Sequence, residues 1–113
     1  MKMKLNVVQR IEIYKHLPTK GSILTLKTVE SLRSKVAFSD DEIKEFELEE
    51  YEEGGLLKSK WNDKGREPIE IEFKDSDIKF LKGLFEKLSE NKPDDFNFIM
   101  LSIYEQIESL ISE

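Results

Sequence analysis

Cysteine is absent from this 113-residue sequence, and histidine occurs only once. The lack of cysteine excludes disulfides and thiolate metal ligands, and it fits a reducing compartment. Nucleophilic catalysis needs a base beside its nucleophile, and His16 has no identifiable catalytic partner in the sequence. We therefore interpret His16 as a cation at the end of a helix, where it interacts favourably with the helix dipole.

Several other signals are missing as well. No apolar run approaches the length of about 18 residues that a membrane-spanning helix needs. The opening MKMKLNVVQR lacks the long apolar stretch of a secretory signal. There is no GxGxxG or GxxxxGK[ST] phosphate loop, and the acids of residues 39–53 lack the Asp-x-Asp-x-Asp-Gly pattern that wraps calcium. We expect a cytoplasmic protein with no membrane association, no enzymatic activity, no catalytic or metal-binding residues and no cofactor.

Charge is plentiful but unevenly distributed along the chain. Residues 1–38 carry eight cations and two acids, a net charge of +6, whereas residues 39–53 carry one cation and nine carboxylates, a net charge of −8. Residues 54–113 add −4, which gives −6 for the whole chain. This asymmetry indicates either a charged partner or two segments that lie side by side and neutralise each other.

Two helices are predicted before the acidic segment. Apolar residues recur at helical spacing over about 7–17, with Asn6 as the N-cap and Pro18 as the stop. A second apolar stripe predicts a helix over about 25–35, with residues 23–24 as a short extended lead into it.

The acidic segment itself begins with a capping box. Ser39 is followed by Asp40, Asp41 and Glu42, so the serine caps a short third helix while Glu42 bonds back to the Ser39 amide. Three strands are predicted after it, at roughly 46–52, 56–61 and 67–73. Gly54-Gly55 favours a tight hairpin between the first two, because glycine tolerates positive φ.

Two further helices are predicted at the C-terminal end, one starting near Asp75 and one capped by Asp94 or Asp95. The last helix is apolar over much of its circumference, so we expect part of it to be covered by the hairpin sheet or by a second copy in a homodimer. The side chains that point away from its main stripe are Phe98, Leu101, Tyr104 and Ile111.

These elements predict a single α+β domain spanning residues 1–113. Three short N-terminal helices, a small antiparallel sheet of two or three strands and two C-terminal helices give a winged-helix-like order. The chain is long enough for one modest core. It contains no internal repeat and no low-complexity linker.

Function is predicted most directly by the acidic surface. We expect it to bind an unidentified basic protein by charge complementarity. Tyr51 and Trp61 are candidate aromatic anchors beside it, although a lone tryptophan in a small domain is more often at the edge of the core. The carboxylates of this surface are Asp40, Asp41, Glu45, Glu49, Glu50, Glu52 and Glu53.

The alternative is an atypical nucleic-acid-binding regulator. In a helix-turn-helix the second helix enters the major groove, but here the N-terminal residues of that helix are acids, which repel phosphate. Contacts would have to come from the basic N-terminal third, and retention on heparin at low salt would separate the two hypotheses. Sequestration of a small molecule is a third option. The candidate nucleic-acid contacts are Lys20, Lys27, Arg33 and Lys35.

The layout of the chain resembles that of small uncharacterised proteins encoded by bacteriophages and prophages. The similarity rests on LNVVQRIEIYKHLPTKGSILTLKTVESLRSKVAFSDDEIKEF, the acidic hairpin, IEIEF and the closing LSIYEQI. No catalytic or binding motif accompanies it, so no functional residue is carried over. The resemblance implies a phage or prophage origin, action in the cytoplasm of the bacterial host, and an accessory role.

Overall fold

Two of the predicted strands pair with each other, whereas the third pairs with a segment at the start of the chain. The computed structural model describes residues 1–111. Its elements are, in chain order, β1 (Lys2–Leu5), α1 (Val7–His16), α2 (Ile23–Val36), α3 (Asp40–Glu45), β2 (Glu49–Glu53), β3 (Leu56–Lys60), the 3₁₀ turn η1 (Asp63–Arg66), β4 (Ile69–Glu72), α4 (Asp75–Asn91), the 3₁₀ turn η2 (Pro93–Asp95) and α5 (Phe98–Ile111).

The strands form two separate antiparallel sheets of two strands each, β1–β4 and β2–β3. The α+β class is confirmed, but β4 does not extend the hairpin into a three-stranded sheet. It pairs instead with β1, in a register that places Met3 opposite Ile71 and Leu5 opposite Ile69. Met3 and Leu5 are buried while Lys2 and Lys4, which alternate with them, are exposed, so one face of this small sheet packs on the helices.

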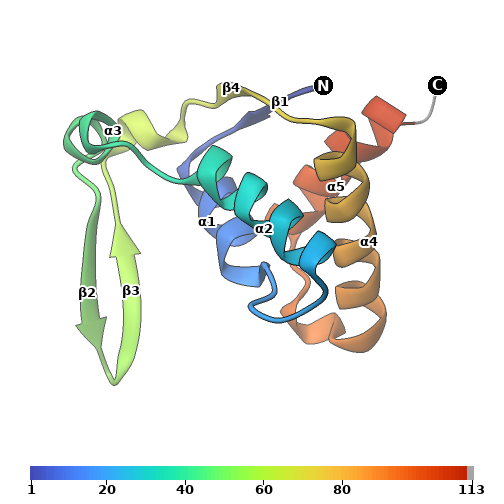
Figure 1. Cartoon of the computed structure of the whole chain (residues 1–113). Helices are drawn as coiled ribbons and strands as arrows, with labels where there is room; N and C mark the ends of the chain where they lie inside the picture. Colours follow the sequence, from blue (N-terminus) through green and yellow to red (C-terminus); the bar gives the residue numbers. More distant parts are fainter. Residues whose placement is uncertain (112–113) are drawn as a thin grey trace.

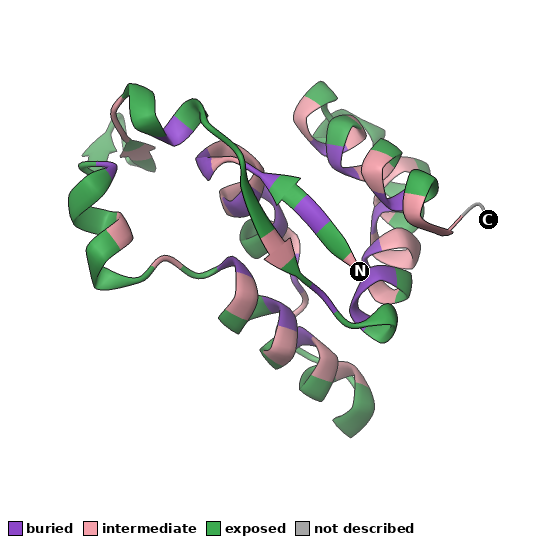
Figure 2. Ribbon diagram, turned by 90° about the horizontal axis from the view of Figure 1, so that it is seen from above, coloured by how far each residue is buried: buried purple, intermediate pink, exposed green. Residues whose placement is uncertain are grey.

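A body of four helices supports that sheet (Figure 1). Helix α1 packs against α2 and α5, and α4 packs against the same two helices. Figure 2 shows buried residues on the helices and on the strand at the start of the chain. The continuous core consists of Met3, Leu5, Ile13, Leu17, Val29, Leu32, Val36, Phe73, Ile78, Leu81, Phe85, Met100, Ile103 and Ile107. No helix within residues 1–111 has the length and apolar character to cross a bilayer.

The first three helices begin at polar caps, two of them as predicted. The predicted N-cap at Asn6 and the predicted capping box at Ser39 are both confirmed, and the structure shows a complete capping box at Asn6 as well. Helix α2 starts earlier than expected, because the Ser22 hydroxyl accepts a hydrogen bond from the Thr25 amide. Residues 23–24 are therefore helical, not extended.

The start and the outer side of α5 also differ from expectation. Asp94 and Asp95 lie in η2, and the side chain of Asn97 accepts the hydrogen bond from the Met100 amide that caps α5. Of the four outward side chains, only Phe98 is strongly exposed, at 87%. Leu101, Tyr104 and Ile111 are half-buried, and the Tyr104 hydroxyl donates a hydrogen bond to Glu86 at 3.0 Å. A homodimer through this face stays a prediction.

Candidate protein-interaction surface

The acidic hairpin is built as the sequence predicts. Strands β2 and β3 pair in an antiparallel register that runs from Glu49 opposite Lys60 to Glu53 opposite Leu56. Gly54 and Gly55 form the two-residue turn with φ of 61° and 79°. Positive φ at both positions is the requirement of the tight turn that best matches strand twist, so glycine is needed here for its backbone freedom.

The hairpin projects from the body and is anchored at one end only (Figure 1). At its base the Asn62 amide donates to the Phe46 carbonyl at 2.8 Å, and the Leu48 amide donates to the Ile43 carbonyl at 2.9 Å. Beyond this base every residue of β2 is exposed, and Ser59 is the only half-buried residue of β3. The hairpin is thus fixed to α3 and free at its tip.

Alternation along the strands gives the hairpin two chemically different faces. The outer face carries the pairs Glu49–Lys60, Tyr51–Lys58 and Glu53–Leu56. The inner face carries the pairs Glu50–Ser59 and Glu52–Leu57, and Leu48 precedes Glu50 on the same side.

Lysines neutralise the glutamates of the outer face. Lys60 Nζ lies 3.1 Å from a carboxylate oxygen of Glu49, and Lys58 Nζ lies 3.9 Å from one of Glu53. Lys60 also lies 5.9 Å from the ring centroid of Tyr51. Within residues 1–111 the carboxylates of Glu50 and Glu52 on the inner face have neither an ion pair nor a hydrogen bond.

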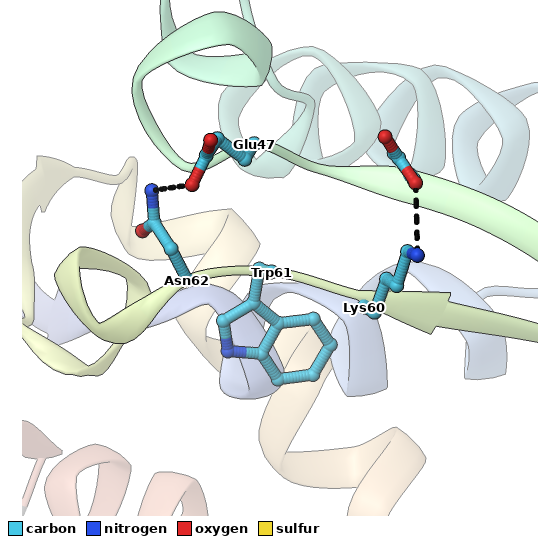
Figure 3. A pocket seen from close by; sticks show the side chains of 5 residues that line it. Glu47, Lys60, Trp61 and Asn62 are labelled. Atoms are coloured by element: carbon cyan, nitrogen blue, oxygen red, sulfur yellow. Dashed lines mark hydrogen bonds and ion pairs between the residues drawn. The ribbon is translucent and has the colours of Figure 1, made fainter.

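A shallow polar hollow of about 270 Å³ lies at the outer base of the hairpin (Figure 3). The Asn62 side-chain amide bridges the Glu47 carboxylate at 3.1 Å and the Glu45 carbonyl at 2.9 Å. Trp61 points away from these polar groups (Figure 3) and packs against Gly65, where an added Cβ would lie 2.5 Å from the indole Cδ1. Of the two candidate aromatic anchors, Tyr51 is exposed, whereas Trp61 is half-buried at the base.

The acids of α3 are also exposed, but they do not gather with those of the hairpin into one cluster. Asp40, Asp41 and Glu45 lie on α3 at the base, while β2 carries its glutamates away toward the tip (Figure 1). In the part of the chain that the structure describes, no group of three or more acidic or histidine side chains is arranged to hold a metal ion.

Only one carboxylate of the acidic segment pairs with the basic N-terminal third. Glu42 accepts hydrogen bonds from the Arg10 guanidinium at 2.6 and 3.1 Å, while Arg10 also donates to the Val36 and Ala37 carbonyls at 3.1 and 2.6 Å. Arg10 is only 2% exposed and lies 4.1 Å from the ring centroid of Phe38. The bonds from Arg10 hold the pKa of the Glu42 carboxyl below its ordinary value of 4.5.

The candidate nucleic-acid contacts are only partly free. Lys35 bonds at 2.6 Å to Asp77, which is buried and also caps the start of α4 through the Lys74 amide. Arg33 donates to the Tyr14 hydroxyl at 3.0 Å. Lys20 and Lys27 are exposed. Of the four residues, only Lys35 is therefore held in an ion pair within residues 1–111, while Lys20, Lys27 and Arg33 are exposed.

His16 lies at the end of α1, where the sequence places it. Its Nε2 is 3.4 Å from a carboxylate oxygen of Glu12, one turn earlier on the same helix. That oxygen of Glu12 is buried and makes no hydrogen bond within the described chain. The contact is a local helix pair.

Comparison with known proteins adds no assignment: no family model, curated protein or solved structure matches the chain.

Proposed function

We propose that this protein is a non-enzymatic binding protein that recognises a basic protein partner through the β2–β3 hairpin. The observation that carries the proposal is the hairpin itself, which projects from the body with all of β2 exposed. A two-stranded hairpin is only marginally stable when it stands alone in water. Association with a partner would bury it and stabilise it.

The side chains of the hairpin support a mixed apolar and electrostatic contact. Leu56 and Leu57 are 66% and 70% exposed at the tip, and Tyr51 is exposed on the outer face. Strand β2 also carries four glutamates. Aromatic and apolar groups provide the binding energy of an interface, while complementary charge steers the encounter and selects the partner.

The test compares two variants with the same change in net charge. In the hairpin variant the four β2 acids Glu49, Glu50, Glu52 and Glu53 become glutamine. In the control variant four exposed acids of the helical body, Glu90, Asp94, Asp95 and Glu105, become the corresponding amides. Binding of fluorescein-labelled oligolysine is measured by anisotropy at low and high salt.

We expect the hairpin variant to bind oligolysine at least about tenfold more weakly than the control variant. Equal weakening of both variants would show that net charge alone attracts the probe. That result would overturn the proposal.

We further propose, on the phage resemblance alone, that the protein acts as an accessory protein in the cytoplasm of a bacterial host. Expression in a bacterium, followed by fractionation, tests the location. Recovery in the membrane fraction would contradict it.

The alternative is a winged-helix-like regulator that binds nucleic acid through its basic N-terminal third. The order of three helices followed by a hairpin supports it, as do the exposed Lys20 and Lys27. The exposed acids at the start of α3 oppose it, because they would face phosphates. Salt-sensitive retention on heparin that is lost in a double Lys20→Gln, Lys27→Gln variant would favour this alternative.

A further inference from the structure

A groove separates the inner face of the hairpin from the helical body, with a volume of about 340 Å³. Ile11, Ile43 and Leu48 contribute apolar side chains to its lining, and Glu50 and Ser59 contribute the hairpin wall. The volume lies within the range of about 300–1,000 Å³ that is usual for ligand sites.

Beyond the groove, the inner face of the hairpin continues toward the tip. Beyond Glu50 and Ser59, the next pair toward the tip on the same face is Glu52 and Leu57. The hairpin lysines belong to the outer face, where they neutralise its glutamates. The inner face therefore combines apolar contact area with two carboxylates that lack a partner in residues 1–111.

We propose that this groove and the inner face together bind an extended segment of a partner protein in which a large apolar side chain is flanked by lysine or arginine. The apolar side chain fills the groove between Ile11 and Ile43, and the flanking cations meet Glu50 and Glu52. This inference rests on the proposed function, and it adds the face that is used and the sequence pattern that is recognised.

Charge favours such a segment over a second copy of this chain. Residues 49–60 carry four glutamates and two lysines, so two hairpins repel each other. The inner face also extends beyond the groove to Glu52 and Leu57, which suits an extended chain with side chains at a spacing of two residues. A basic peptide satisfies both the carboxylates and the apolar lining.

Two peptides probe the groove directly. One is a fluorescein-labelled leucine flanked by two lysines on each side, and the other has serine in place of the leucine.

The groove is filled in the variant Ala37→Phe. Ala37 lines the groove and has extended backbone angles that phenylalanine adopts readily. Thr19→Phe, in an exposed loop, is the matched control.

We expect the leucine peptide to bind wild type at least about tenfold more tightly than the serine peptide. Ala37→Phe should abolish this advantage, and Thr19→Phe should preserve it. Thermal unfolding monitored by circular dichroism checks that both variants are folded.

A second pair of variants separates the two faces of the hairpin at equal net charge. Glu50→Gln with Glu52→Gln should weaken binding of both peptides by about tenfold, more than Glu49→Gln with Glu53→Gln does. Equal weakening by the two pairs would overturn the choice of the inner face.

The remaining outcomes distinguish the inference from the proposed function. If oligolysine binds through the hairpin but the leucine peptide gains nothing, or if Ala37→Phe leaves its gain intact, the groove inference is wrong and the proposed function stands. If neither probe binds, the proposed function itself fails. If sedimentation shows a dimer that Ala37→Phe converts to monomer, a second copy occupies the groove and the inference is overturned.

Discussion

Replacing Arg10 with methionine should strongly destabilise the fold, because this buried side chain joins three elements. The guanidinium donates to the Val36 and Ala37 carbonyls at the end of α2 and to the Glu42 carboxylate in the capping box of α3. The fork of arginine suits such a site, since it presents several donors in a fixed plane. Methionine fills a similar volume but donates no hydrogen bond.

The loss of stability in Arg10→Met depends on the Glu42 carboxylate, which is left without its partner. Removing one partner of a buried ion pair costs about 3–5 kcal/mol. Glu42 retains its bond from the Ser39 amide and has some access to water, which places the loss toward the lower end of that range. A native domain has about 5–15 kcal/mol of stability in total. For a chain of this length, the expected loss of about 3–4 kcal/mol lowers Tm by about 12–16 °C.

Thermal unfolding followed by circular dichroism at neutral pH measures the effect. Arg66→Met is the matched control, because the Arg66 side chain is 82% exposed and its 3.6 Å pair with Asp63 lies at the surface. Exposed pairs contribute about 0–1 kcal/mol, so this control should stay close to wild type. Similar Tm values for the two variants would show that Arg10 does not hold α1, α2 and α3 together.

The same pair predicts a pH dependence with a defined sign. The pKa of the Glu42 carboxyl is lowered in the folded protein, chiefly by the hydrogen bond from Arg10. Its stabilising contribution is therefore fully present above the unfolded pKa and is lost as pH falls through the lower folded pKa. We expect the stability gap between wild type and Glu42→Gln to be constant near neutrality and to shrink below pH 4.5. A gap that widens on acidification would contradict this assignment.

Two further substitutions test the packing of the body and the hairpin base. Lys35→Met should cost about 3 kcal/mol, measured by urea unfolding, because it leaves the carboxylate of Asp77 buried without its cation. An unchanged midpoint would show that water replaces the lysine. Gly65→Ala should cost about 1–3 kcal/mol and shift the fluorescence of Trp61, because the new Cβ meets the indole at 2.5 Å. Gly83→Ala is its control, since a Cβ there meets nothing within 4 Å and helix propensity favours alanine.

Local signals in the sequence predicted the local structure. The Asn6 cap of α1 and the capping box at Ser39 each depend on residues three positions apart, and the Gly54-Gly55 turn depends on adjacent residues. Such features are decided by short-range hydrogen bonding and backbone sterics, so their meaning changes little with the rest of the fold.

Pairing between distant segments was not predictable in the same way. Strand β4 showed an alternating pattern, but nothing in it selected β1 over the hairpin as its partner. The alternation of Lys2, Met3, Lys4 and Leu5 was the available signal for β1, and it is only four residues long. The bond of Arg10 to Glu42 spans 32 positions and likewise has no local signature.

The separation between body and hairpin shows what charge counts along the chain leave out of the candidate site. A net charge of −8 for residues 39–53 counts all nine acids equally, but in the fold they lie in different surroundings. Glu42 stabilises the junction with α1, and the outer-face glutamates meet lysines of β3. Glu50 and Glu52 differ from Glu49 and Glu53 only by one step of strand alternation, which places them on the inner face, where Glu50 lines the apolar groove. Because the hairpin contributes none of the residues of the continuous core, substitutions at these two positions should change binding while leaving the stability of the body within about 0.5 kcal/mol of wild type.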